Sequence, residues 1–567
     1  MQGERLEAYH FYERSWDGYD DLRAAFEWEV PERFNAAEYV CDRWADDADG
    51  DRIALYGERA DGTRTTYTYR ELAAATDRLA GALAERGIGR GDRVGVNAPQ
   101  RPETAMAHVA CWKLGAVSVP LSTLFGTEAL RYRLADADAD ACVVDAANAD
   151  TLRAVRDDAD ADLDLGTVLA VGADPREDEV GFDAALAAAD PVDGPVETDA
   201  EDDAIVIYTS GTTGEPKGVR HAHRVLLGNL PLFVTGFCDL DLRADDVLWT
   251  PAEWAWVATL FDVLFPGLFY GQSVVAYDGG PFDPETAFEI VERYGVTNFF
   301  APPTALRMMA DADPSGYDLS SVRVVPSGGE SLGASVVEWA GETFDGAAVH
   351  EGYGQTEANM LVGDCTALTE FREGTIGPPA PGHEVAILDR ESRDPLPRGE
   401  VGEIAVRHEG NPVCFKSYLG KPEATRAKLH EGWLLTEDLG RMDEDGYVTF
   451  VGRADSVIIS AGYRIGPVEI EEALASHPDV ADAGVIGVPD EKRGEVPKAF
   501  VVPARSAGEN SGASASDDLA AALRDHVRER LAEYEYPREI EFVDDLPKTT
   551  TGKLRRVALE EREGLCE

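Results

Sequence analysis

The chain has 567 residues, 44% of them hydrophobic, and its 52 basic and 107 acidic side chains give a formal net charge of −55. This length and apolar content predict several folded domains, or one large body with a satellite, and argue against intrinsic disorder. The acidic surface would repel a phosphate backbone and an anionic membrane. We therefore expect neither nucleic-acid binding nor docking on such a membrane.

The basic residues are unevenly divided, with nine lysines against 43 arginines. An acid excess with few lysines suits a protein that works in concentrated salt, where the Debye length falls to about 3 Å at 1 M and screens surface self-repulsion. We therefore expect a halophilic protein from a salt-accumulating cell. An ordinary acidic cytosolic protein is the plainer alternative.

Seven cysteines are scattered without a CxxC pair, which predicts reduced thiols in a cytoplasm rather than disulfides or a zinc site. The first twenty residues show no basic segment followed by an apolar one, so no signal peptide is expected. The most apolar long stretch, residues 254–270, is interrupted by Asp262 and Pro266, so we expect no membrane insertion. A cytoplasmic location follows.

Segments typical of helices and strands alternate through most of the chain. The first are a helix over 70–86, a strand over 93–97, a helix over 102–114 and a strand over 116–120. This rhythm predicts βαβ units and a largely parallel sheet. The Asp- and Ala-rich segment 136–164 is interpreted as a solvated acidic face.

The character of the sequence changes near residue 455. Short apolar runs at 457–459, 483–488 and 499–502 predict strands, and a flexible stretch is expected over 506–518. Apolar residues then recur every four positions from Leu519 to Leu531, as on one face of a helix. These features predict a small α+β domain after the larger α/β part.

One loop carries the clearest chemical signal. The apolar run 204–208 leads directly into TSGTTGEPKG, residues 209–218. Glycines let backbone amides approach a phosphate closely, the hydroxyls of this loop add donors, and Lys217 supplies a cation for β- and γ-phosphates. The pattern is not the P-loop, because no Ser or Thr follows the lysine.

The segment YTSGTTGEPKG resembles the phosphate-binding signature of the adenylate-forming superfamily, which includes acyl- and aryl-CoA synthetases, peptide-synthetase adenylation domains and luciferases. Five further segments follow in the family's order and approximate spacing: EGYGQTEA (351–358), GEIAVR (402–407), WLLTEDLG (433–440), GRADSVIISAGYRIGPVEIE (452–471) and LPKTTTGK (546–553). The resemblance implies an α/β fold with a large N-terminal AMP-binding domain over 1–454 and a small mobile C-terminal domain over 455–567.

The resemblance also implies the reaction. A carboxylate attacks the α-phosphate of ATP to give an acyl-adenylate and pyrophosphate, and the thiol of CoA then displaces AMP. Because the first step brings anions together, the site must neutralise charge with Mg²⁺ and lysines. The substrates implied are ATP, CoA and a small carboxylic acid.

The nucleotide-binding residues follow from the matching motifs. The resemblance implies ATP or AMP contacts from Thr209, Ser210, Gly211, Thr212, Thr213, Gly214, Lys217, Gly329, Glu330, Ser331, Glu351, Gly352, Tyr353, Gly354, Gln355, Thr356, Asp438, Arg453 and Lys553. Within this set, Tyr353 would stack on adenine and Thr356 would contact the α-phosphate. Asp438 and Arg453 would hold the ribose hydroxyls, although an aspartate there also suits a cap or a turn. Glu357 would hold Mg²⁺ through oxygen, as a hard cation prefers.

Lys553 is the residue expected to carry adenylation, with Thr356 and Lys217 as its catalytic partners. Its ammonium would bridge the attacking carboxylate and the α-phosphate and so stabilise charge in the transition state. Lys548 is a secondary contact or a plain surface lysine. The scarcity of lysine in this chain favours a functional reason for keeping Lys553.

The resemblance places a hinge at Asp455, about which the C-terminal domain would swing between the two half-reactions. The CoA-binding residues it implies are Ser460, Ala461, Gly462, Tyr463, Arg464 and Arg493. The alternative for Arg493 is an ordinary surface ion pair.

The chain departs from the family at Thr436-Glu437-Asp438, where Thr-Gly-Asp is usual. If the glycine serves a positive φ, Glu437 is strained. If it only makes room, Glu437 points to solvent, and this is the outcome we expect.

The acyl pocket is expected from one further position. Acetate-activating relatives place a tryptophan before the motif glutamine, and this chain has Gly354, which should leave the pocket open. Trp254, Trp256, Val257 and Phe261 would line it, with core packing as the alternative for the tryptophans. Large apolar walls favour an aliphatic or aromatic acid over acetate. The motifs look most like the medium-chain acyl-CoA synthetase branch, and medium-chain, branched-chain and benzoate-type acids stay open.

Three classes of function fit the sequence. The first is a free-standing acyl-CoA ligase, with an acetate or propionate ligase as a variant. The second is an adenylation enzyme that loads a carrier protein in trans. The third is a binding protein with a degenerate site, which the intact Lys217, Glu357 and Lys553 argue against. An oligomer is possible in each case.

Overall fold

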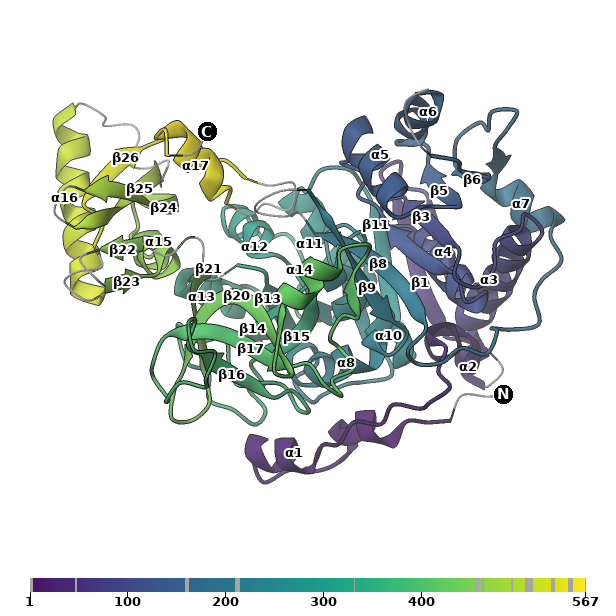
Figure 1. Cartoon of the computed structure of the whole chain (residues 1–567), viewed down its shortest axis with the longest axis horizontal. Coiled ribbons are helices and arrows are strands. Elements are labelled where there is room, and N and C mark those ends of the chain that lie inside the picture. The colour runs from purple at the N-terminus through teal and green to yellow at the C-terminus, as the bar shows by residue number, and fades with distance from the viewer. Residues whose placement is uncertain are drawn as a thin grey trace.

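The structure of the chain is a computed structural model. It describes residues 4–45, 48–158, 163–209, 215–330, 332–453, 456, 458–460, 463–490, 493–504, 513–531, 536–548 and 554–565. The described strands form four sheets. Two large sheets and a smaller antiparallel one make up the bulk of the molecule, and the fourth lies at one end of its long axis (Figure 1).

The first large sheet has the strand order β18-β9-β8-β4-β3-β5-β6-β7. Its members from β8 to β7 run parallel, while β9 and β18 continue it antiparallel. The strands are β3 (Arg93–Asn97), β4 (Val117–Pro120), β5 (Ala141–Asp145), β6 (Thr167–Val171), β7 (Val180–Gly181), β8 (Asp203–Thr209), β9 (Lys217–Ala222) and β18 (Ser417–Tyr418). The helices between and beside them are α3 (Tyr69–Ala84), α4 (Pro102–Lys113), α5 (Thr127–Asp136), α6 (Ala149–Asp157) and α7 (Phe182–Ala188).

The second large sheet has the order β15-β14-β13-β12-β10-β11-β1-β2, parallel except at its two edges. Its strands are β1 (Ile53–Arg59), β2 (Arg64–Thr68), β10 (Val247–Trp249), β11 (Ser273–Asp278), β12 (Asn298–Phe299), β13 (Val324–Gly328), β14 (Ala348–Gln355) and β15 (Ala358–Gly363). The helices α8 (Val225–Leu232), α9 (Val257–Thr259), α10 (Phe265–Phe269), α11 (Pro284–Tyr294), α12 (Pro303–Ala310) and α13 (Ala334–Thr343) precede or connect them, together with the π-helical turns η4 (Phe233–Phe237) and η5 (Leu260–Leu264).

The remaining N-terminal elements are short: η1 (Glu7–Glu13), α1 (Tyr19–Ala25), η2 (Glu38–Asp42), α2 (Arg43–Ala45) and η3 (Ala48–Asp51). The third sheet is antiparallel and contains β16 (Val385–Leu388), β17 (Gly402–Arg407), β19 (Leu429–His430), β20 (Trp433–Met442) and β21 (Val448–Arg453), with α14 (Pro422–Ala427) beside it.

The fourth sheet gathers the C-terminal strands β22 (Ile458–Ser460), β23 (Tyr463–Ile465), β24 (Val480–Asp490), β25 (Gly494–Pro503) and β26 (Glu539–Phe542). The helices α15 (Pro467–Ala475), α16 (Ala513–Arg530) and α17 (Arg556–Arg562) belong to the same group. Figure 1 shows this yellow-green group at the end of the molecule opposite α7. The expected α/β fold with a small α+β unit is confirmed, while the expected hinge Asp455 lies outside the described residues.

The expected elements of the first sheet are confirmed to within two residues, and local chemistry accounts for their ends. Helix α3 begins after Thr68, whose side chain accepts a hydrogen bond from the Glu71 amide, while the Glu71 carboxylate accepts one from the Thr68 amide. Helix α11 begins after Asp283, whose side chain accepts a hydrogen bond from the Thr286 amide, and ends at Gly295, whose positive φ suits glycine.

One expectation was wrong in part. The stretch 506–518 was expected to be flexible, but α16 begins at Ala513 and includes 513–518. The alanines of this stretch favour a helix. The part of the stretch before Ala513 lies outside the described residues.

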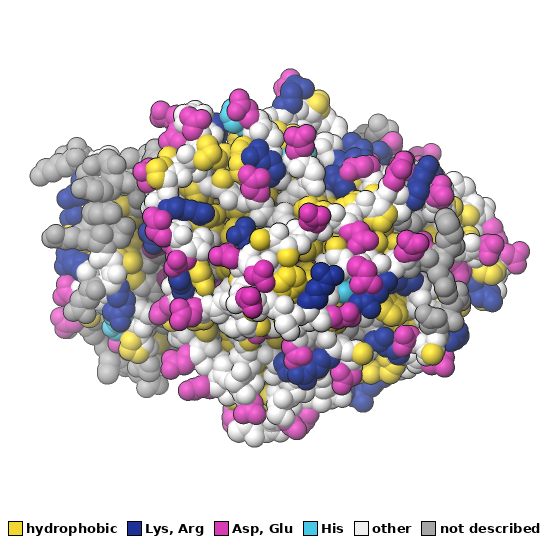
Figure 2. Space-filling view, turned by 90° about the horizontal axis from the view of Figure 1, so that it is seen from below, with side chains coloured by type: hydrophobic (Ala, Val, Ile, Leu, Met, Phe, Trp, Pro, Cys, Tyr) yellow, Lys and Arg dark blue, Asp and Glu magenta, His cyan; other side chains and the backbone are white. Residues whose placement is uncertain are grey.

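Apolar side chains from the two large sheets and the helices between them form one extended core. Figure 2 shows acidic side chains spread over the described part of the visible face, with arginines and lysines among them. The six described cysteines are buried and unpaired, as expected, and Cys566 is not among the described residues. In the described part of the chain, no helix is both long and apolar enough to cross a membrane.

Candidate active site

The predicted phosphate loop connects two neighbouring strands of the first sheet. Strand β8 ends at Thr209 and β9 begins at Lys217, and these two residues pair across the ladder. The intervening loop residues Ser210, Gly211, Thr212, Thr213 and Gly214 lie outside the described residues. The ladder therefore fixes both ends of the loop and puts Lys217 at its exit.

Lys217 lies against a small polar cluster. Its Nζ is 5.1 Å from the ring centre of Tyr418, and the Tyr418 hydroxyl donates a 2.5 Å hydrogen bond to Glu357 Oε1. Burial and the Glu357 carboxylate raise the pKa of Tyr418, so its hydroxyl stays a neutral donor. Strand β18 brings Tyr418 here by pairing it with Val219 of β9. Two residues far apart in sequence, Lys217 and Glu357, thus meet through one tyrosine.

The donor set around Glu357 suits Mg²⁺ only with help from the substrate. In the described part of the chain, no group of three or more His, Cys, Asp or Glu side chains is placed to hold a metal ion. One buried carboxylate next to a phosphate loop is, however, a usual protein contribution to a Mg²⁺ site, where phosphate oxygens and water complete the shell. The residues therefore fit a Mg²⁺ ion that arrives with ATP.

A second cluster, which we call the ribose cradle, consists of Tyr353, Gln355, Asp438 and Arg453. Asp438 on β20 is 4% exposed, and its Oδ2 accepts hydrogen bonds from the Tyr353 hydroxyl at 2.8 Å and from Gln355 Nε2. Strand β21 pairs Arg453 with Asp438, and the Arg453 guanidinium lies 3.5 Å from Asp438 Oδ1. Burial raises the pKa of Asp438 despite these partners.

The other oxygen of Asp438 has an ion pair with Arg453 but no hydrogen bond among the described residues. Asp438 Oδ1 is buried and receives no hydrogen bond from any described residue. A buried acceptor without a hydrogen bond is costly, and the ion pair with Arg453 offsets only part of that cost, so a ligand hydroxyl at this point would lower the energy of the site further. A ribose diol beside Arg453 meets that need.

Tyr353 has contacts through both its hydroxyl and its ring. Its hydroxyl is committed to Asp438, and its ring lies 6.2 Å from the ring of Phe450 at an interplanar angle of 39°. Tyr353 therefore helps to orient Asp438 in the ribose cradle. Stacking on adenine stays a prediction.

Glu437 corrects an expectation. Its φ is +62°, so the position does use the left-handed region in which glycine is usual, and the expectation that glycine only makes room was wrong. The side chain is 55% exposed, but it also lies 3.1 Å from Lys428 Nζ and 3.8 Å from Arg453 Nη2. These two cations compensate for part of the backbone strain.

The segment expected along adenine connects two parallel strands. Gly328 of β13 pairs with Gly352 of β14, and a Cβ at Gly328 would come within 2.6 Å of the Gly352 carbonyl oxygen. Gly329 follows with a φ of +92°, and Glu330 lies 3.7 Å from Arg307. The side chain of Glu351 accepts a hydrogen bond from the amide of Leu332. Ser331 is outside the described residues.

Thr356 sits in the turn between β14 and β15. Its carbonyl accepts a 2.7 Å hydrogen bond from Nε2 of His221 on β9, which fixes the imidazole tautomer. Burial lowers the pKa of His221 to about 4, so the ring is neutral. The bond ties the β14–β15 hairpin, and with it Glu357, to the phosphate-loop strands.

The segment expected to form the acyl pocket lies largely in the core. Trp254, Val257 and Phe261 are buried, whereas Trp256 is partly exposed and packs edge-on against Phe125. Gly354 has a steric reason of its own, because a Cβ there would lie 2.5 Å from the Met360 amide nitrogen. The open pocket at Gly354 stays a prediction.

The C-terminal candidates are described only in part. Ser460 is buried on β22, and Arg493 lies at the start of the hairpin strand β25, where its amide bonds to Asp490. Strand β23 includes Tyr463 and Arg464, whose side chains are not described, and Ala461, Gly462 and Lys553 lie outside the described residues. Lys548 pairs with Asp482 at 2.8 Å, which favours the structural alternative for that residue.

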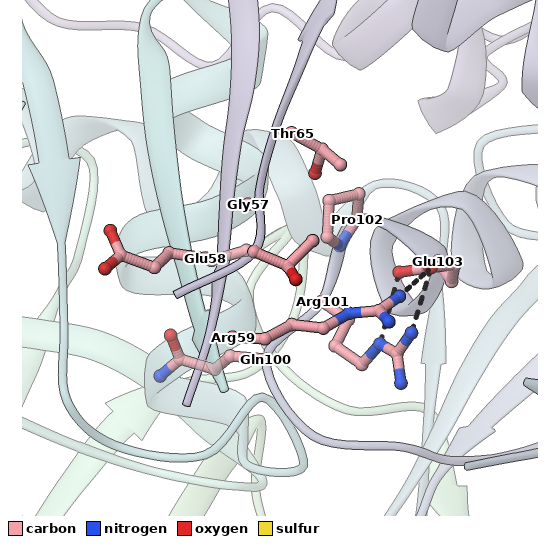
Figure 3. A pocket seen from close by; sticks show the side chains of 10 residues that line it. Gly57, Glu58, Arg59, Thr65, Gln100, Arg101, Pro102 and Glu103 are labelled. Carbon is pink, nitrogen blue, oxygen red and sulfur yellow. Dashed lines mark hydrogen bonds and ion pairs between the residues drawn. The ribbon is translucent and has the colours of Figure 1, made fainter. Parts of the chain in front are cut away.

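Two cavities of different size lie away from all of these residues. Figure 3 shows one between β1 and the start of α4, where Glu103 pairs with Arg59 and Arg101. Its volume of about 10 Å³ holds a single water molecule. The other, of about 310 Å³, lies beside it at Tyr56 and Arg64. Neither is lined by a residue of the predicted site.

Comparisons with known proteins identify the family of the chain. Residues 41–419 match the family described as AMP-binding enzyme, and residues 469–553 match the AMP-binding enzyme C-terminal domain. Acyl-coenzyme A synthetase ACSM3 of Mus musculus, a mitochondrial protein, is 34% identical over 559 residues, which cover 97% of this chain and 94% of the relative. The uncharacterized acyl-CoA ligase YtcI of Bacillus subtilis (strain 168) is 36% identical over 521 residues, covering 91% and 94%.

Solved structures give the same result. An anthranilate CoA ligase in complex with anthranoyl-AMP has a TM-score of 0.85 and 28% identity, covering 94% of this chain and 98% of that one. An acyl-CoA synthetase of Brucella canis has a TM-score of 0.73 and 34% identity, covering 97% and 99%. The chain therefore belongs to the AMP-binding enzyme family, and within it to the acyl-CoA synthetases that react through an acyl-adenylate.

Proposed function

We propose that the enzyme activates a medium-chain, branched-chain or aromatic carboxylic acid with ATP and transfers the acyl group to CoA. The observation that carries this proposal is the pairing of two clusters along the β14–β15 hairpin. One is the ribose cradle with its buried acceptor at Asp438, and the other joins Lys217 and Glu357 through Tyr418. The first cluster would bind the ribose of ATP, and the second would bind its phosphates.

Several residues on the phosphate side would together neutralise the negative charge of the ATP phosphates. Lys217 would meet the β- and γ-phosphates together with the loop residues Thr209 to Gly214, and Thr356 would meet the α-phosphate. Glu357 would hold Mg²⁺, which supplies positive charge against the phosphate oxygens when it is bound. Tyr418 keeps the Glu357 carboxylate oriented and needs no proton transfer to do so.

On the nucleoside side, Asp438 and Arg453 would take the ribose hydroxyls, and the strand and turn at Gly329, Glu330 and Ser331 would line adenine together with Glu351, Gly352 and Gly354. Within the cradle, Tyr353 and Gln355 hold one carboxylate oxygen of Asp438 and so fix the direction of the other. Preorganised donors of this kind bind without reorganising at the moment of reaction.

The C-terminal group would serve both half-reactions. With a hinge at Asp455, one orientation would deliver Lys553 to the α-phosphate, and the other would bring Ser460 to Arg464, with Arg493, to CoA. We expect Lys553→Ala to abolish adenylation and largely keep thioester formation from supplied acyl-adenylate. Equal loss of both half-reactions would contradict the assigned role.

The acid class rests on the pocket walls and on the relatives. Trp254, Trp256, Val257 and Phe261 would supply the apolar walls, although three of them are largely buried in the core, and Gly354 would add no side chain to the pocket. Similar structures include an anthranilate CoA ligase and a benzoate CoA ligase, which supports an aromatic acid alongside the aliphatic ones.

The test is ATP–pyrophosphate exchange with a panel of acids from acetate to octanoate, branched acids and benzoates, in molar KCl, followed by CoA consumption. Exchange and thioester formation with acids longer than propionate are the expected result. Exchange without thioester formation would favour carrier-protein loading, and preference for acetate would overturn the acid class. No exchange with any acid would refute the proposal.

We also propose that the enzyme works in the concentrated salt of a halophilic cytoplasm, because a net charge of −55 needs screening. Loss of fold or activity on dilution to low ionic strength is the expected result. Full activity in dilute buffer would contradict this proposal and leave the ligase activity untouched.

A further inference from the structure

The apolar segment of the candidate acyl pocket contains one charged residue. From Val257 to Phe269 the sequence reads VATLFDVLFPGLF, and Asp262 interrupts it at the centre of the π-helical turn η5. Its neighbours Leu260, Phe261, Val263 and Leu264 are all buried in the main core. A carboxyl group in such surroundings is costly unless something uses it.

Asp262 is held by an amide relay from two other elements. Asn359 of β15 donates its Nδ2 protons to Asp262 Oδ1 and, at 2.9 Å, to Asn229 Oδ1 on α8. Asn229 in turn donates to the Val225 carbonyl at 2.7 Å within its own helix. The relay fixes one carboxyl oxygen of Asp262 and supplies no positive charge to it.

The relay starts at an irregular point of the β14–β15 hairpin. The pairing shifts register after Tyr353, and Met360 adopts a φ of +57°, which is rare for a residue with a side chain. Gly354 faces this irregularity, since a Cβ there would lie 2.9 Å from the Asn359 Cα. The same hairpin therefore carries both Gly354, expected to leave the acyl pocket open, and Asn359, the partner of Asp262.

Two buried polar groups in and next to this segment make fewer hydrogen bonds with the described residues than they could. Asp262 keeps 6% exposure deep inside the molecule, and the Asn359 amide is its one hydrogen-bond partner among the described residues. The indole N–H of Trp254 is buried with no acceptor in the described part of the chain. A pocket for a purely apolar acid has no use for either group.

We propose that Asp262, held by Asn359, is a specificity-determining residue of the acyl pocket and selects acids that carry a hydroxyl or amino group away from the reacting carboxylate. This inference rests on the proposed function and narrows its substrate class. The donor of the substrate would bond to the second oxygen of Asp262. An acid without that group leaves a desolvated carboxyl unpaired, and buried polar groups reject such analogues strongly.

The test compares matched acids with the full-length enzyme in molar KCl, using ATP, Mg²⁺ and CoA. The pairs are hexanoate with 6-hydroxyhexanoate and 6-aminohexanoate, and benzoate with its ring-hydroxylated and ring-amino derivatives. We expect the wild type to prefer at least one substituted acid by about tenfold or more in kcat/KM. Asp262→Leu should reverse that preference, and Asp262→Asn should fall between.

A matched control separates specificity from folding. Asp246 is also a buried carboxyl, bonded to Arg323 and Gln272 away from this segment, so Asp246→Asn should leave the ratio between paired acids unchanged. A wild type that prefers the unsubstituted acid in every pair overturns the inference, even if Asp262→Leu does not fold. An unchanged ratio in Asp262→Leu overturns it as well. Absence of activity with all acids would instead refute the proposed function.

Discussion

The nucleotide side and the acyl side of the candidate site are built in different ways. The ribose cradle stands on three strands, and each of its side chains is tied to a partner on another strand. The acyl segment consists of short helical turns, α9, η5 and α10, whose side chains are mostly apolar and buried in the core. Polar contacts between strands define a single geometry, which suits a nucleotide that the whole family binds. Short packed turns can differ between family members, which suits an acid that also differs.

Among changes on these two sides, the largest effect is expected from breaking the ribose cradle. Asp438→Ala removes the buried acceptor and the anchor of Tyr353, and hydrogen bonds to a charged group contribute about 1.5–3 kcal/mol each. We expect ATP–pyrophosphate exchange to fall roughly a hundredfold or more, mainly through the KM for ATP. The matched control is Asp445→Ala on the same β20–β21 hairpin, where the carboxylate pairs with Arg372 instead. An unchanged KM for ATP in Asp438→Ala would contradict the cradle.

A smaller effect is expected at the phosphate side. Tyr418→Phe removes the hydrogen bond to Glu357 and keeps the ring against which Lys217 lies. Partners that orient a metal-binding carboxylate typically contribute ten- to a hundredfold in metal affinity, so the Mg²⁺ concentration for half-maximal exchange should rise about tenfold. A titration of exchange rate against Mg²⁺ measures it. If only the KM for the acid moved, Tyr418 would belong to the acyl side.

The two sides also differ in how far sequence could predict them. The strands and the motif residues were predictable because runs such as AIVIY and the glycine-rich turns dictate local structure. The meeting of Lys217 with Glu357 was not, since it depends on Tyr418 arriving through the edge strand β18. Asp262 was noted only as an interruption of an apolar run, because its partner Asn359 lies 97 positions away. Contacts between distant segments leave no local pattern in the sequence.

The strand β15 links both sides, and its end provides a test of stability. Asp364 follows it, is fully buried, and has no hydrogen-bond partner for either carboxyl oxygen among the described residues. Burial, and secondarily Glu351, raises the pKa of Asp364 to about 8. The folded state therefore holds a proton that the unfolded chain has lost, and stability falls as pH rises from about 4 to about 8.

Asp364→Asn removes this titration. We expect a higher melting temperature than the wild type at pH 8.5, by roughly 5 °C, and no difference at pH 4. The matched control is Asp394→Asn at an exposed position. Its melting temperature should equal that of the wild type at both pH values. A difference that persists at pH 4 would mean that packing, not ionisation, sets the effect.

The smallest effect concerns the strained backbone beside the ribose cradle. Glu437 and Glu431 both have positive φ, at +62° and +45°, but only Glu437 reaches the buried Lys428. Replacement by glycine relieves about 1 kcal/mol of strain at each position. Glu431→Gly should therefore raise the urea midpoint slightly, whereas Glu437→Gly should gain nothing, because it leaves the Lys428 ammonium buried without its carboxylate. Equal rises in the urea midpoint of the two variants would show that the contact between the Glu437 side chain and Lys428 does not stabilise the fold. The nucleotide side would then tolerate the loss of this surface charge.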